Sequence, residues 1–128
     1  MITMNNLIFS IFPSEIFVDL CLYQYGWEKC KPSHSFGPVS REHYLFHYII
    51  SGTGTLMAND SHGITQNYEI KPQQGFMIFP GQFNMYAASS DSPWEYIWIE
   101  FDGLRVKEAI EATGLCFDRP IYHSRSNE

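Results

Sequence analysis

The sequence of 128 residues has few basic residues: 8 lysines and arginines against 14 acidic residues, for a formal net charge of −6. A protein that binds a phosphate backbone needs a basic surface, so we do not expect this chain to bind DNA by itself. The sequence also lacks an apolar run of 18 residues, and we expect no contact with a membrane. Its 3 cysteines contain no Cys-x-x-Cys pair, which favours reduced thiols in a cytoplasmic protein over a zinc or redox site.

Motifs for catalysis and phosphate binding are absent as well. The sequence has no Gly-x-Ser-x-Gly, no His-Glu-x-x-His, no P-loop and no Gly-x-Gly-x-x-Gly. The segment Gly52-Thr53-Gly54 matches only the first part of a dinucleotide-binding motif, and no predicted helix follows it. We therefore expect neither an enzyme nor a bound cofactor.

Aromatic and β-branched residues, in contrast, are abundant and occur in short runs between turn-forming residues. Aromatic residues make up 16% of the chain, and runs of this kind predict strands. The segment 31–40 contains two prolines and a glycine, so it is predicted to be a loop. Seven or eight short strands without intervening helices predict an antiparallel sandwich or barrel. The predicted strands are 17–25, 44–51, 55–58, 64–70, 76–79, 85–88 and 94–101, with a hairpin turn at 59–63.

The hydrophobic period changes from strand-like to helical after Asp102. Apolar residues at helical spacing predict one helix over 104–113, with Asp102 as its N-cap and Gly114 at its C-terminal end. The whole chain is then one domain, with an N-terminal arm (1–15), a β-barrel (16–103) and a C-terminal helix (104–114).

The predicted strand 94–101 presents two chemically different faces, because side chains alternate along a strand. One face is mainly aliphatic and suits a dry core. The other carries indoles, a phenol and a carboxylate, whose polar tips need partners. A wet lumen or a bound sugar would supply these partners, although an ordinary core could also do so through backbone groups or solvent. The first face holds Glu95, Ile97, Ile99 and Phe101, and the second holds Trp94, Tyr96, Trp98 and Glu100.

The polar residues around the predicted strand 44–51 allow several interpretations. His43 and His47 are four residues apart, which on a strand is about 13 Å, too far for two ligands of one metal ion. We expect His47 to be a hydrogen-bonded interior histidine and His34 to be solvated. Arg41 could contact a polar ligand, or it could pair with Glu42 or another surface acid.

In their order along the chain, several short motifs resemble the N-terminal ligand-sensing domain of AraC/XylS-type bacterial transcription regulators. The resemblance covers roughly residues 20–104. It implies a cupin-like, jelly-roll-type β-barrel that binds a small effector, and helices that often form the dimer contact. The motifs are Tyr25-Gly26, Cys30-x-Pro32, His34-x-Phe36-Gly37-Pro38 with Arg41, the run 44–54, the run 75–80, Tyr86-Ala87 and the run 93–103.

The same resemblance implies a sugar effector and identifies individual ligand-binding positions. Family members with these motifs are often regulators of sugar uptake and breakdown. Trp98 and Tyr86 match family positions that contact a sugar, and Tyr96 matches another contact position with a different residue. Where metal-binding cupins have a late histidine, this chain has Asn84, and a His-x-His motif is absent, which favours a metal-free barrel.

In regulators of this family, DNA is bound by two helix-turn-helix units that follow the sensing domain. We expect this chain to be part of such a longer protein, to bind a small-molecule effector and to form a homodimer. Two alternatives remain: a dimerisation module with a closed barrel, and a small metal-dependent cupin enzyme. The candidate ligand-binding residues are Trp98, Tyr86, Tyr96, Arg41, His47 and Glu100.

Overall fold

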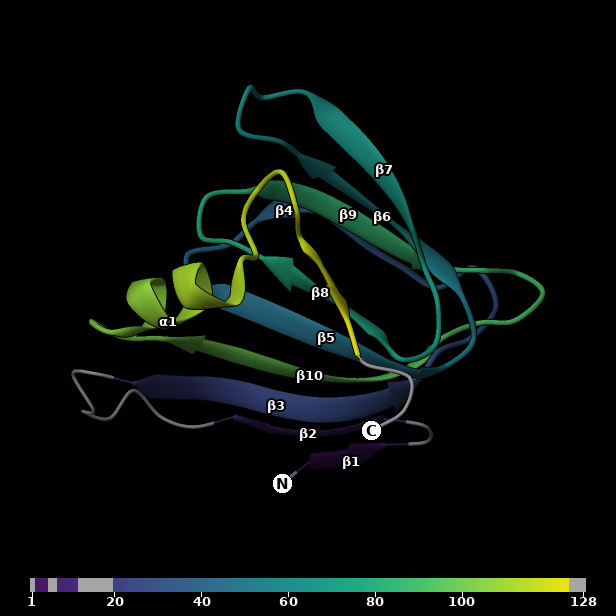
Figure 1. The fold of residues 1–128 in the computed structure, drawn as a ribbon. Coiled ribbons are helices and arrows are strands. Elements are labelled where there is room, and N and C mark those ends of the chain that lie inside the picture. Colours follow the sequence, from purple (N-terminus) through teal and green to yellow (C-terminus); the bar gives the residue numbers. More distant parts are fainter. Residues whose placement is uncertain (1, 5–6, 12–19, 125–128) are drawn as a thin grey trace.

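The computed structural model describes residues 2–4, 7–11 and 20–124, and it describes side chains from residue 20 onward. Two antiparallel sheets face each other, and a single short helix lies at one end of them (Figure 1). The larger sheet has the order β1-β2-β3-β10-β5-β8-β11, and the smaller has the order β4-β9-β6-β7. The strands are β1 (Ile2–Met4), β2 (Leu7–Ile11), β3 (Cys21–Lys29), β4 (Ser35–Ser40), β5 (Tyr44–Ser51), β6 (Gly54–Asn59), β7 (Thr65–Ile70), β8 (Gln74–Ile78), β9 (Phe83–Ala88), β10 (Glu95–Asp102) and β11 (Ile121–His123).

This arrangement confirms the predicted antiparallel, cupin-like β fold with a C-terminal helix. No ladder of hydrogen bonds joins the two sheets within the described part of the chain, so the barrel is open along its sides. The predicted strands 44–51 and 94–101 correspond to β5 and β10, which pair with each other in the middle of the larger sheet. The predicted hairpin turn at 59–63 joins β6 to β7.

One prediction about secondary structure was wrong. The segment predicted as a loop (31–40) contains the strand β4, which tolerates its proline because it pairs on one side only, with β9. Three strands were not predicted from the sequence. Part of the predicted arm forms β1 and β2, which extend the larger sheet beyond β3, and β11, after the helix, pairs with β8. Of the predicted strand 17–25, the part before residue 20 lies outside the described residues.

The predicted helix is present as α1 (Val106–Thr113), but it begins two residues later than expected. Its N-cap is Arg105, which makes no side-chain capping bond, and Asp102 instead accepts a hydrogen bond from the Gly103 N–H. Gly114 ends the helix in the left-handed conformation, as predicted. Val106 and Ile110 are buried in a small apolar cluster with residues of β5 and β8, so the apolar face of α1 packs on the larger sheet.

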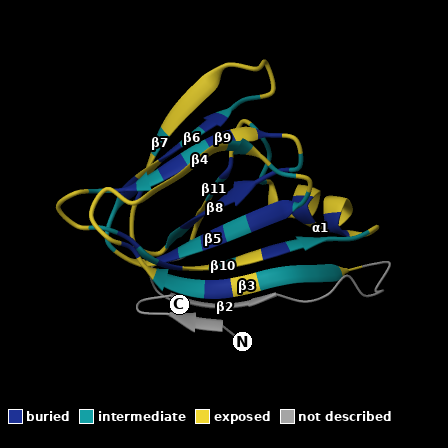
Figure 2. Cartoon of the chain, turned by 180° about the vertical axis from the view of Figure 1, so that it is seen from behind, coloured by how far each residue is buried: buried dark blue, intermediate teal, exposed yellow. Residues whose placement is uncertain are grey.

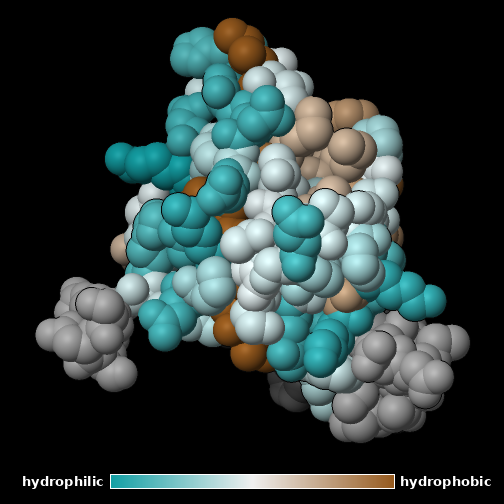
Figure 3. All heavy atoms as spheres, turned by 90° about the vertical axis from the view of Figure 1, so that its right-hand side faces the viewer, coloured by the Kyte–Doolittle hydropathy of each residue, from teal (hydrophilic) through white to brown (hydrophobic). Residues whose placement is uncertain are grey.

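The main core lies between the sheets, where Leu45, Ile49, Leu56, Ile78 and other side chains are fully buried. Burial alternates along β5 and β6, while β7 is mostly exposed (Figure 2). The side of the molecule shown in Figure 3 is mainly hydrophilic, with hydrophobic residues in small separate groups. No helix in the described part of the chain is long and apolar enough to cross a membrane.

Of the two predictions for the faces of β10, the one for the aliphatic face was wrong. The aliphatic face was expected to form the dry core, but Ile97 is 45% exposed and Ile99 is 36% exposed. The face with Trp94, Tyr96 and Trp98 points between the sheets instead, and Trp94 is part of the core. The Trp94 indole N–H donates a hydrogen bond to the Ile70 carbonyl oxygen (3.1 Å), so a backbone group satisfies this polar tip.

Candidate ligand-binding site

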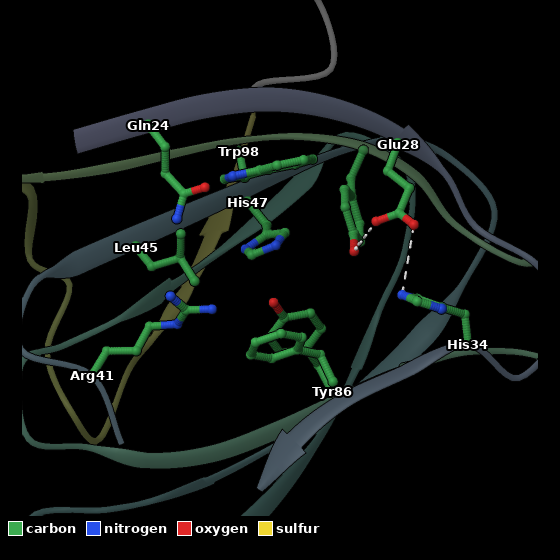
Figure 4. Close-up of a pocket in the computed structure, with 10 residues that line it drawn as sticks. Gln24, Glu28, His34, Arg41, Leu45, His47, Tyr86 and Trp98 are labelled. Atoms are coloured by element: carbon green, nitrogen blue, oxygen red, sulfur yellow. Dashed lines mark hydrogen bonds and ion pairs between the residues drawn. The ribbon is translucent and has the colours of Figure 1, made fainter. Parts of the chain in front are cut away.

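A cavity of about 340 Å³ lies between the two sheets. This volume is at the low end of the range of roughly 300–1,000 Å³ typical of small-molecule sites. Side chains from both sheets point into the same space (Figure 4). The lining residues are Gln24, Glu28, His34, Phe36, Arg41, Leu45, His47, Tyr86, Tyr96 and Trp98.

The register of the larger sheet explains how its residues meet at this cavity. Trp98 lies opposite Gly26 of β3 on one side and His47 of β5 on the other. Because Gly26 has no side chain, the neighbouring strand leaves the Trp98 indole uncovered at this position. Tyr96, two residues earlier on the same face, lies opposite Glu28. Strand alternation therefore brings aromatic and polar groups together on one inward surface.

The aromatic part of the cavity wall is built around His47. The centroids of the Tyr96 and Tyr86 rings lie 4.6 Å and 4.8 Å from the centroid of the imidazole, both edge to face. Tyr96 also contacts Trp98 edge to face at 6.1 Å. From the smaller sheet, Phe36 stacks on Tyr86 at 5.5 Å. The rings thus form one continuous apolar surface across both sheets.

At one end of the cavity, Glu28 connects the two sheets. Its carboxylate accepts a hydrogen bond from the Tyr96 hydroxyl (3.2 Å), and its other oxygen lies 3.6 Å from Nε2 of His34 (Figure 4). His34 immediately precedes β4 of the smaller sheet. His34 is exposed, as expected, but its imidazole also lines the cavity and faces a carboxylate.

At the other end, three polar side chains contact the carboxylate of Glu100. It accepts a short hydrogen bond from the Gln24 amide (2.6 Å), and Nδ1 of His43 lies 3.3 Å from its second oxygen. The Arg41 guanidinium lies 3.7 Å from the same oxygen and 4.9 Å from the centroid of the Phe36 ring. Arg41 thus lines the cavity and pairs with the buried Glu100, not with Glu42 or another surface acid. Its contact with a ligand stays a prediction.

Burial changes the protonation of the groups in this cavity. It lowers the pKa of His47 to about 3, with the Arg41 guanidinium acting in the same direction, so the imidazole is neutral. Burial also raises the pKa of Tyr86 and Tyr96 above the usual value of a phenol. His47 was expected to be a hydrogen-bonded interior histidine. It is buried, but its Nδ1 has no hydrogen-bond partner among the described residues, and the same holds for Nε of Arg41.

Five of the six predicted ligand-binding residues line this cavity: Trp98, Tyr86, Tyr96, Arg41 and His47. The sixth, Glu100, lies behind the wall and holds Gln24 and Arg41. The sequence reasoning did not identify Gln24, Glu28, Phe36 or Leu45. A signal for Gln24 was present, because it is a polar residue within the predicted strand 17–25, and Glu28 follows it at an even spacing that keeps the same face.

The described residues offer no set of side chains that could bind the metal ion of a cupin enzyme. No group of three His, Cys, Asp or Glu side chains in the described part of the chain could hold a metal ion. Asn84 is buried, and its amide donates hydrogen bonds to the carbonyl oxygens of Val39 and Gln82.

The outer face of the larger sheet carries a second hollow, which we call the outer groove. It is apolar and crosses β3, β10 and β5. Trp98 lines both this groove and the cavity. The other lining residues are Tyr25, Gly26, Trp27, Phe46, Tyr48, Ile97 and Ile99.

Comparison with known proteins gives a consistent picture. Residues 22–125 match the family described as AraC-like ligand binding domain. The chain is 33% identical over 106 residues to the Msm operon regulatory protein of Streptococcus mutans, covering 83% of this chain and 36% of that protein. It is 32% identical over 102 residues to the raffinose operon transcriptional regulatory protein RafR of Pediococcus pentosaceus, covering 76% of this chain and 35% of that protein. The chain therefore spans about a third of the length of these relatives.

Among solved structures, the fold is similar to oxalate decarboxylase from Bacillus subtilis. A serine-to-alanine mutant of that enzyme superposes with a TM-score of 0.56 at 9% sequence identity, covering 92% of this chain and 42% of the enzyme chain. A tryptophan-to-phenylalanine mutant of the same enzyme gives a TM-score of 0.54 at 11% identity, covering 84% and 34%. At this level of identity the similarity concerns the fold alone.

Proposed function

This chain belongs to the family of AraC-like ligand-binding domains, and we propose that it is the effector-sensing domain of a transcription regulator and binds a sugar in the cavity between its sheets. In this proposal the chain is not an enzyme. DNA is bound by another part of a longer cytoplasmic protein, and the sugar controls that binding.

The observation that carries the proposal is the chemistry of the cavity wall. Trp98, Tyr86 and Tyr96 provide aromatic surfaces on which the C–H face of a sugar ring can stack. Gln24, Glu28 and Arg41 provide hydrogen-bonding groups beside these rings. A pocket that combines apolar rings with a few convergent polar groups is suited to a small polar ligand.

The relatives support both halves of the proposal. Both carry names of operon regulators, and one of these names contains a sugar, raffinose. The acidic balance of this chain, with a net charge of −6, also agrees with a role in which other residues contact the phosphates of DNA.

The position of β3 suggests how the cavity communicates with the N-terminal arm. Strand β3 carries Gln24 and Glu28 on its inner face and pairs with β2 on the side away from β10. An effector that binds one arrangement of β3 more tightly than another shifts the equilibrium between them by its difference in affinity. The packing of β1 and β2 would then depend on whether the cavity is occupied.

Self-association is a further part of the proposal. The apolar face of α1 packs on the sheet, so the support comes from the outer groove instead. This groove exposes Ile97 and Ile99, and a contiguous apolar patch of this kind is typical of an interaction surface. We propose that two copies of the chain meet at this surface.

The two alternatives predict different observations. A dimerisation module with a closed barrel has no room for an effector, whereas this chain has a cavity of about 340 Å³ beside Trp98. A metal-dependent cupin enzyme needs a bound ion, and elemental analysis of the purified protein that found one metal ion per chain would favour this alternative.

The proposal is tested by titrating neutral sugars, including glucose, galactose, melibiose and raffinose, into the protein and following its tryptophan fluorescence and the heat of binding. We expect at least one sugar to give saturable binding in both measurements. The substitution Tyr86→Ala should weaken this binding by roughly tenfold or more, because it removes a buried ring from the cavity wall.

The matched control is Phe83→Ala, which removes an aromatic ring from the same strand at a position that is 55% exposed and outside the cavity. This variant should bind the sugar as the parent protein does. If no sugar binds while circular dichroism shows a folded protein, the sugar-sensing proposal is wrong.

A further inference from the structure

The charged side chains in and around the cavity include one arginine and two glutamates. Among the described residues, Arg41 is the one lysine or arginine that lines it. Two carboxylates lie at its two ends, Glu28 in the wall and Glu100 behind it. The imidazole of His34 also lines the cavity, but it lies 3.6 Å from Glu28 and faces that carboxylate.

The positive charge of Arg41 is already matched by a neighbour. Its guanidinium lies 3.7 Å from Glu100, and the two side chains are only 20% and 11% exposed. Water screens a pair at this depth less than a pair on the surface. A ligand with a negative charge would therefore compete with Glu100 for Arg41 and would also meet the carboxylate of Glu28.

The hydrogen-bonding groups of the cavity also point to a ligand that both donates and accepts. One N–H of the Gln24 amide is bonded to Glu100, which leaves the second N–H as a donor and the carbonyl oxygen as an acceptor. The Glu28 carboxylate is an acceptor as well, whereas the Arg41 guanidinium is a donor. A hydroxyl group can serve both kinds, but a carboxylate or phosphate at neutral pH accepts almost exclusively.

We propose that the cavity selects uncharged saccharides and rejects sugar acids and sugar phosphates, and that Glu100 sets this selectivity by neutralising Arg41. This inference rests on the proposed function and specifies the ligand class of the same site. Glu100 acts through Arg41 and Gln24, so it is a specificity-determining residue that does not itself line the cavity.

The test compares sugars that differ in charge but hardly in shape. Glucose, galactose and mannose are each titrated by calorimetry together with the matching uronate and the methyl ester of that uronate. For a sugar that binds, we expect the uronate to bind at least about tenfold more weakly, because a unit charge near Glu28 is repelled. The methyl ester, which is neutral again, should recover most of the lost affinity.

Two variants then assign the selectivity to the cavity. Glu100→Gln keeps the shape of the side chain but leaves Arg41 unneutralised, so the preference for the neutral sugar should fall to less than about threefold. The control Glu69→Gln removes the same charge from β7. Glu69 is exposed and pairs with Lys71, and the substitution should leave the preference unchanged. Circular dichroism and thermal melting check that both variants fold. If Glu100→Gln does not fold, Glu28→Gln provides the second test, and it should also reduce the preference.

The outcomes separate the two proposals. A uronate that binds as tightly as its neutral parent, or more tightly, overturns the selectivity while sugar sensing stands. An equal effect of Glu69→Gln and Glu100→Gln assigns the preference to the overall charge of the protein and also overturns the role of Glu100. A series in which neither neutral nor charged sugars bind, in a folded protein, overturns sugar sensing and the selectivity together.

Discussion

The imidazole of His47 is stacked on the ring of Phe76, with the centroids 4.7 Å apart and the ring planes at 11°. Phe76 is fully buried, and so is His47. This contact places an ionisable group in the apolar core beside the cavity, and it makes the stability of the fold depend on pH.

The first prediction concerns this pH dependence. Burial, with help from Arg41, lowers the pKa of His47 in the folded protein to about 3, from 6.5 in an unperturbed histidine. Above pH 6.5 the imidazole is neutral in both states. Below it, the unfolded chain takes up a proton that the folded chain does not. The free energy of unfolding should therefore decrease as the pH falls from 6.5 towards 3, by up to about 1.4 kcal/mol per pH unit.

Urea denaturation between pH values of about 7.5 and about 4.5, which span the upper part of this range, measures the effect. The variant His47→Gln should lose less stability over this range than the parent protein, because the titrating group is gone. His62→Gln, on the exposed hairpin turn between β6 and β7, is the control and should follow the parent. Equal pH profiles for the parent and His47→Gln would contradict the assignment.

The second prediction concerns the reactivity of Cys30. Burial raises the pKa of this thiol to about 11, and the side chain belongs to the main core. Only the thiolate reacts with iodoacetamide, so Cys30 should be alkylated at about pH 8 at least about tenfold more slowly than Cys21 or Cys116, which are partly exposed. Peptide mass spectrometry over time measures the three rates, and in concentrated urea they should become similar. Fast modification of Cys30 in the folded protein would show that this part of the core opens readily.

The third prediction concerns Gly54, the first residue of β6. A Cβ atom at this position would overlap the Trp94 indole and lie 2.5 Å from the Ala87 carbonyl oxygen. Gly54→Ala should therefore lower the free energy of unfolding by about 1–3 kcal/mol, the usual cost of overpacking a core. The exposed neighbour Thr55→Ala is the control, and its effect should stay below about 1 kcal/mol. Urea denaturation of both variants decides the point, and equal stabilities would contradict the packing described.

The fourth prediction tests self-association at the outer groove. Ile97→Glu places a charge in the middle of this apolar surface, where Ile97 is 45% exposed. If two copies meet there, the dissociation constant of the dimer should rise by about tenfold or more. Sedimentation velocity at several concentrations measures it, with Thr65→Glu on the exposed strand β7 as the control. A parent chain that is monomeric throughout would refute this part of the proposed function.

The sequence was most informative where the chain alternates regularly between buried and exposed side chains. Strands such as β5 and β10 could be located because aromatic and β-branched runs are bounded by turn residues. It was least informative at edges of sheets. Strand β4 resembles a loop because Gly37 and Pro38 interrupt it, and only its position beside β9 makes it a strand.

The candidate site was predictable to the extent that it depends on strand alternation. Alternation along the strand placed Tyr96 and Trp98 on one face, whereas Tyr86 was identified only through the resemblance to the family. The assignment of Ile97 and Ile99 to the core was wrong, because this sheet is apolar on both faces and the outer face carries the groove. The contacts of Glu100 with Gln24 and Arg41 join residues far apart in the chain, and no local pattern reveals such contacts.

Trp98 lines the cavity and also the outer groove, so the two hollows share this residue of β10. Gly26, its partner on β3, lines the outer groove as well. If a molecule in one hollow favours one arrangement of this residue pair, it alters affinity in the other hollow, and by thermodynamic reciprocity the effect runs both ways by the same factor. Coupling of this kind would require no movement of the sheet as a whole.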